Sequence, residues 1–138
     1  MSARAEEAVQ AALMASLRAD ADVQSVFGTP ARVFDVESEA PLYPYALIER
    51  HETSPAGASL VEGIEHRITL ACYSRDYGVC GAKACLSALR AAVERAGWAV
   101  AGRHVVLAQV VYADAMRTAD KRAFRGLVRI RIISEEAG

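Results

Sequence analysis

Residues 63–74, with the sequence GIEHRITLACYS, show the clearest alternation of apolar and polar side chains in the chain. Successive side chains of a β-strand point to opposite faces, so this period of two predicts a strand with one buried face. The buried face is expected to carry Ile64, His66, Ile68, Leu70 and Cys72, and the other face Glu65, Arg67, Thr69, Ala71 and Tyr73.

Helical patterns lie on both sides of this strand. Apolar residues spaced three and four apart predict a helix over residues 79–96, which Gly97 ends. The same spacing predicts a first helix over residues 3–17, and a short second helix is expected over residues 22–27 with Asp22 as its N-cap. The chain has 28 alanines but few aromatic residues, and this composition favours closely packed helices.

Four further segments are expected to be strands: residues 32–35, 45–52, 105–115 and 124–133. The segment 105–115 is strongly apolar, so we expect cover on both of its faces. Short connections favour an antiparallel arrangement. The order α-(α)-β-β-β-α-β-β therefore predicts an α+β fold in which an antiparallel, mixed-length β-sheet carries two main helices on one face. A chain of 138 residues suits a single domain, 1–138.

Composition excludes several classes of protein. No apolar run approaches the ~20 residues of a membrane span, and the first uncharged run follows acidic residues, unlike a signal peptide. The net charge of −1 argues against a broad nucleic-acid-binding surface. Residues 1–62 carry 4 basic and 10 acidic side chains, whereas residues 63–138 carry 12 and 7. Such a split suits head-to-side association of copies in a ring, or alternatively two interleaved halves whose charges cancel.

No pattern for catalysis, a cofactor or a metal emerges from the residues. His66 among apolar strand neighbours is expected to be a packed, hydrogen-bonded core residue. Three cysteines lack the spacing of a zinc site and are expected to be small buried side chains. The acidic run Asp35, Glu37 and Glu39 has no calcium-loop glycine, so a solvated rim is the better interpretation. We therefore expect no enzyme and no cofactor.

Cations gather near the end of the chain, and alternation places Arg125, Arg129 and Arg131 on one side of the last strand. This face is either simply solvated or an electrostatic interface with an acidic neighbour, and passing DNA is a third possibility. The polar loop 53–62 and the connection 116–122 are natural docking elements. The candidate assembly residues are Arg117, Lys121, Arg122, Arg125, Arg129, Arg131, Asp35, Glu37, Glu39, Ser54, Leu60 and Glu62.

Four stretches in a fixed order resemble the tail terminator, or tail completion, proteins of long-tailed phages and of alphaproteobacterial gene transfer agents. They are LRADADVQSVFG at 17–28, PYALIER at 44–50, GIEHRITLACYSRDYG at 63–78 and MRTADKRAFRGLVRIRI at 116–132. Tyr73 stands where such proteins often carry a tryptophan, and the loop before Gly63 lacks aromatic residues.

The resemblance implies a ring, of six copies, at the head-proximal end of the tail tube. Such a ring ends tube polymerisation and presents the joining surface for the head-tail connector, and DNA passes through it without sequence-specific binding. It also implies synthesis in the bacterial cytoplasm, a place at the tail-neck junction of the particle and no membrane partner. Two alternatives stay open: another neck protein, such as a head completion or connector subunit, and a small ligand-binding α+β domain.

Overall fold

The computed structural model describes residues 5–36, 38–56, 63–75, 78–118 and 122–136. Its elements, in chain order, are α1 (Ala5–Ala19), α2 (Ala21–Phe27), β1 (Val33–Phe34), β2 (Tyr45–Pro55), β3 (Gly63–Ser74), α3 (Gly78–Arg95), β4 (Arg103–Arg117) and β5 (Phe124–Glu136). No helix among these residues is both long and apolar enough to span a membrane.

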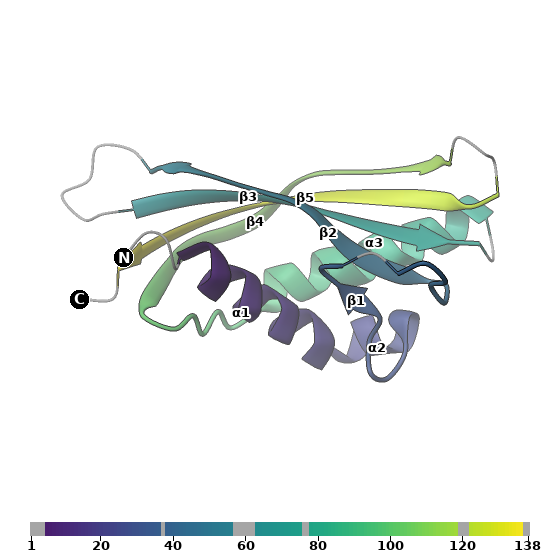
Figure 1. Cartoon of the computed structure of the whole chain (residues 1–138), viewed down its shortest axis with the longest axis horizontal. Helices are drawn as coiled ribbons and strands as arrows, with labels where there is room; N and C mark the ends of the chain where they lie inside the picture. Colours follow the sequence, from purple (N-terminus) through teal and green to yellow (C-terminus); the bar gives the residue numbers. More distant parts are fainter. Residues whose placement is uncertain (1–4, 37, 57–62, 76–77, 119–121, 137–138) are drawn as a thin grey trace.

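The strands form one sheet in the order β1-β2-β3-β5-β4. All neighbours pair antiparallel except β1, which adds two residues parallel to β2. The three helices lie on one side of this sheet, and no helix of the described residues covers its other side, which we call the bare face (Figure 1). The expected α+β class, with helices on one face, is confirmed.

The core lies between the sheet and the helices. The alternation in β3 acts as predicted: Ile68 and Leu70 face the helices and are 1% and 0% exposed, beside Ile130 of β5. Leu13 of α1 and Leu89 of α3 pack against them and are fully buried. Burying one such aliphatic side chain stabilises the fold by about 1.5–3 kcal/mol, so this layer supplies much of the driving force for folding.

Close approach of α3 to the sheet depends on Gly126 of β5. A Cβ at this position would lie 2.6 Å from the Cys72 sulfur and 2.8 Å from Leu86 Cδ2. Any side chain here would have to displace the side chains of Cys72 and Leu86, so the glycine leaves room for them between β5 and α3.

The expected N-cap of α2 is wrong by two residues. Asp20, and not Asp22, caps the helix, because its carboxylate accepts hydrogen bonds from the amides of Asp22 at 2.9 Å and Val23 at 3.2 Å. The same carboxylate forms an ion pair with Arg95 at the end of α3. Burial alone would raise the pKa of Asp20, but these hydrogen bonds and the Arg95 charge outweigh it and lower the pKa. One side chain thus joins the start of α2 to the end of α3.

The expectation that residues 105–115 are covered on both faces is wrong. β4 is the edge strand of the sheet, and α3 covers only its inner face. Val106 and Val111 are 55% and 51% exposed, and each stands at a break in the pairing with β5. Such bulges twist a strand and protect an exposed edge from pairing with another chain.

β2 is longer than expected and continues through Pro55. A break in its register between Ile48 and Arg50 shifts the alternation, so Arg50 pairs with Thr69 on the bare face. Uninterrupted alternation along β2 would place Arg50 on the helix side. The later part of the expected loop, residues 57–62, lies outside the described residues.

Candidate functional site

The bare face of the sheet carries a network of charges across β3 and β5. Glu65 of β3 accepts a hydrogen bond from Arg131 of β5 at 2.9 Å and another from Arg67 at 2.8 Å. The hydrogen bond from Arg131 is the largest cause that lowers the pKa of Glu65, and Arg67 adds to it against the opposing effect of burial. Two guanidinium groups beside a carboxylate favour its charged form.

A second network lies nearer the other end of the same face. The Tyr73 hydroxyl donates to Glu49 Oε2 at 2.6 Å, and Arg125 forms an ion pair with the same carboxylate. Burial and the Glu49 carboxylate raise the pKa of Tyr73. Tyr45 stacks on Tyr73, with ring centroids 5.1 Å apart. Arg125 is therefore largely satisfied within its own subunit.

Arg129 differs from its neighbours on β5. Its guanidinium lies over the ring of Tyr112, 5.1 Å from the centroid, and no carboxylate of the described residues forms an ion pair with it. Its side chain is exposed, so this cation remains available to a partner.

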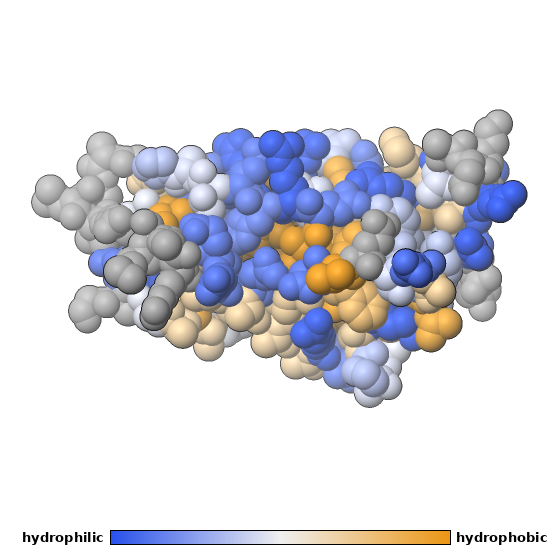
Figure 2. All heavy atoms as spheres, in the orientation of Figure 1, coloured by the Kyte–Doolittle hydropathy of each residue, from blue (hydrophilic) through white to orange (hydrophobic). Residues whose placement is uncertain are grey.

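A groove of about 530 Å³ runs across this face at Arg129. Hydrophilic side chains gather along the upper side of the molecule, where the sheet lies, while paler apolar colour marks the lower side (Figure 2). We call the groove at Arg129 the arginine groove. Its charged lining residues are Arg50, Arg67, Arg129, Arg131 and Glu52, and Tyr112 and Thr69 lie among them.

The predicted cations do not all share this face. Arg125, Arg129 and Arg131 lie on it, as the alternation in β5 predicts. Arg117 stacks over Phe124, 5.0 Å from the ring centroid, at a position of the pair β4–β5 that faces the helix side. Arg122 is exposed, and Lys121 lies outside the described residues.

Of the predicted acidic run, the structure describes Asp35 and Glu39. Asp35 accepts a hydrogen bond from Gln10 of α1 at 3.1 Å, and Glu39 is exposed, while Glu37 falls outside the described residues. Ser54 is exposed near the end of β2, and Leu60 and Glu62 belong to the undescribed loop.

Sequence reasoning missed the acids that accompany Asp35. Glu6 and Glu7 of α1 line the same shallow hollow of about 510 Å³, between α1 and the end of β1. Both lie in the first turn of α1, where acidic side chains interact favourably with the helix dipole. We call Glu6, Glu7 and Asp35 the acidic patch. The sequence alone does not indicate this patch, because Asp35 is far from α1 along the chain.

His66 is the buried, hydrogen-bonded core residue that the sequence predicts. It is 0% exposed, with Nδ1 2.9 Å from His51 Nε2 and Nε2 3.0 Å from Ser134 Oγ. Arg103 donates to the same hydroxyl at 2.9 Å. Burial, then the charges of His51 and Arg103, lower the pKa of His66 to about 4. A neutral histidine with both nitrogens engaged is a structural group here.

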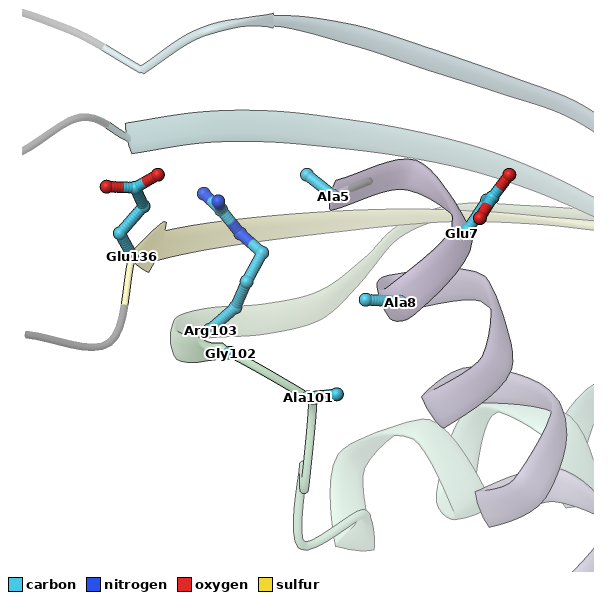
Figure 3. A pocket seen from close by; sticks show the side chains of 7 residues that line it. All are labelled: Ala5, Glu7, Ala8, Ala101, Gly102, Arg103 and Glu136. Atoms are coloured by element: carbon cyan, nitrogen blue, oxygen red, sulfur yellow. The ribbon is translucent and has the colours of Figure 1, made fainter. Parts of the chain in front are cut away.

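A cleft of about 450 Å³ opens beside His66, Ser134 and Arg103. It lies between the start of α1, the start of β4 and the end of β5 (Figure 3). Its charged lining residues are Glu7, Arg103 and Glu136, and the rest are alanine and glycine. Arg103 is already bonded to Ser134. The residues that line it include no serine, cysteine or histidine.

Two of the cysteines meet in the core. Cys72 and Cys85 are free and each is 1% exposed, as expected for small buried side chains. The hydrogen bond with Cys85, together with burial, raises the pKa of the Cys72 thiol, so it stays protonated. Among the residues that the structure describes, no group of three potential ligands could hold a metal ion.

Known proteins match this chain in sequence pattern and in fold. A family model described as tail completion protein gp17 matches residues 11–135. A chain in the virion of a native gene transfer agent particle superposes with a TM-score of 0.82 and 25% identity, covering 94% of this chain and 96% of that one. The bacteriophage SPP1 gp17 protein shares the fold, with a TM-score of 0.65, 16% identity and coverage of 97% and 91%. No curated protein matches significantly in sequence. Because the family model spans most of its length, the chain belongs to the tail completion protein family.

Proposed function

We propose that this protein forms a closed ring, of six copies, at the head-proximal end of a tail tube. The ring ends tube polymerisation and gives the head-tail connector its joining surface. Its partners are copies of itself, the tube protein and the connector, and DNA passes through without sequence-specific contact. In this proposal the chain 1–138 acts as one tail-terminator-like domain.

The family supports the structural part of this proposal. Tail completion proteins are structural virion proteins and not enzymes, which agrees with the expectation from the sequence. Six copies and the connector come from the resemblance alone. Synthesis in the bacterial cytoplasm and a final place at the tail-neck junction belong to the same proposal.

The observation that carries the ring is the two-sided subunit. The bare sheet face holds the arginine groove, and the acidic patch lies on the helix side, between α1 and the end of β1. A ring needs two different, complementary surfaces on each copy, because its contacts are heterologous. In support, the candidate residues Arg125, Arg129 and Arg131 lie on the sheet face, Asp35 lies beside α1, and Glu39 and Ser54 are exposed.

The alternative neck proteins differ in their partner and not in their shape. A head completion or connector subunit would contact portal or adaptor protein in place of the tube. A small-molecule binder is less well supported, because the arginines lie on an open sheet face and His66 is sealed in the core.

Electron microscopy of particles made without this gene tests the function. The proposal expects tails of uncontrolled length together with heads and tails that fail to join. Supplying the wild-type gene in trans is the control and restores both. Tails of normal length that lack heads would assign the protein to a connector role, and normal particles would refute an assembly role.

A further inference from the structure

We infer that the arginine groove binds the acidic patch on α1 of the next copy in the ring. This inference rests on the proposed ring and names the two surfaces that would close it. The groove is Arg50, Arg67, Arg129 and Arg131 on the bare sheet face, and the patch is Glu6, Glu7 and Asp35.

The charges of the two surfaces are complementary. The groove holds four guanidinium groups against the carboxylates of Glu52 and Glu65, a net charge of +2. The acidic patch holds three carboxylates against Arg18, a net charge of −2. Opposite potentials guide two surfaces into register and disfavour pairing of like with like.

Arg129 is the cation that most needs an outside partner. Arg67 and Arg131 both form ion pairs with Glu65. Arg50 forms an ion pair with Glu52, with 3.3 Å between Nη2 and Oε2. Arg129 has only the Tyr112 ring among the described residues. A carboxylate from a neighbouring copy could form an ion pair with Arg129 without breaking an existing ion pair.

The shape of α1 suits a groove. Ala11 and Ala15 lie on its exposed face between the acids and the end of the helix, so the helix backbone can approach a surface closely. Met14 contributes an apolar edge to the same hollow. On the opposite side, Tyr112 and Val111 are exposed apolar side chains at the border of the groove.

The two surfaces lie on opposite sides of one subunit, because α1 packs on one face of the sheet and the groove lies on the other (Figure 1). A copy bound by its groove therefore leaves its acidic patch free for the next copy. Such contacts are head-to-tail and propagate in one rotational sense until the ring closes. Two copies cannot satisfy each other in an isolated symmetric pair.

Cysteine cross-linking in assembled particles tests this contact. The variant carries Ala11→Cys on α1 and Thr69→Cys in the groove, on a Cys80→Ser background, and particles are treated with a flexible bismaleimide. Cys72 and Cys85 are buried and do not react under native conditions. We expect a ladder of covalently linked copies up to the size of the ring. Particles with either cysteine alone are the matched controls and give no ladder.

Several outcomes would overturn the inference. Particles with controlled tail length that contain the variant but show no link between copies reject the contact while leaving the proposed function intact. A second pair, Ala15→Cys with Val111→Cys, repeats the test if the first pair alters assembly, and absence of links in both rejects the contact. A link between two Ala11→Cys copies shows a symmetric contact, and a link to the tube protein assigns the groove to the tube. A Thr69→Cys thiol that reacts only after DNA leaves the particle assigns the groove to DNA.

Discussion

His66 makes the stability of the subunit depend on pH. Its pKa of about 4 in the folded protein is below the ordinary value of 6.5, because burial and the nearby charges of His51 and Arg103 disfavour its protonated form. The unfolded chain therefore binds a proton that the folded chain does not, so stability is complete above about pH 6.5 and falls toward pH 4. We expect a loss of about 2 kcal/mol between pH 7 and pH 5.

Urea unfolding of the subunit at both pH values measures this loss. His66→Gln should be less stable than wild type at pH 7 but lose less on acidification, since the titrating group is gone. Burial lowers the pKa of His51, and the charge of Glu6 opposes this in part. His51 therefore adds a smaller part of the effect. His104→Gln, at an exposed histidine, is the control and should keep the wild-type dependence. Equal losses in His66→Gln and wild type would contradict the assignment.

At the scale of the element, β4 shows how a bulge separates neighbouring side chains. Val111 is 51% exposed, whereas Val110 packs against the core beside Ile130. Val111→Lys should change the free energy of unfolding by less than about 0.5 kcal/mol, because it alters only exposed surface. Val110→Lys should destabilise the subunit by several times that amount, because it places a charge against the core.

Thermal unfolding of the two valine variants decides between the edge position and cover on both faces. If both faces of β4 were covered, the two lysines would be similarly damaging. We expect a much lower melting temperature for Val110→Lys than for Val111→Lys. Equal melting temperatures, both well below that of wild type, would place another layer over the bare side of β4.

At the scale of the whole molecule, charge reversal distinguishes the groove from the internal ion pairs. Arg129→Glu should strongly reduce incorporation of the protein into particles while leaving the subunit folded, because Arg129 has no carboxylate partner among the described residues. A second change, Glu7→Lys, should restore incorporation by reversing the charge on the facing patch. Quantitative blotting of purified particles measures both.

The matched control for this reversal is Arg125→Glu. It places a second carboxylate beside Glu49 and Tyr73, so it should lower the melting temperature of the subunit, and Glu7→Lys should not rescue it. Assembly at the wild-type level with Arg129→Glu would remove the groove from the interface. A drop in melting temperature like that of Arg125→Glu would show a structural role instead.

The sequence alone determined the local geometry of β3 and β5 and the core position of His66. Alternation with a period of two is a local property, so it places Ile68 and Arg129 on opposite faces without knowledge of any partner strand. The helices were predicted from apolar residues spaced three and four apart, which is also a local property. The N-cap of α2 is Asp20 and not Asp22, because either acid fits the capping pattern in the sequence.

Only the tertiary structure decided which strand lies at the edge and which charges cancel. The apolar segment of β4 looks like a central strand in isolation, but β5 pairs with β3 on its other side and leaves β4 outermost. Glu65 and Arg131 are 66 residues apart, and Glu49 and Arg125 are 76 apart. No local pattern encodes such pairs, because the order of strands is set by competition for burial across the whole chain.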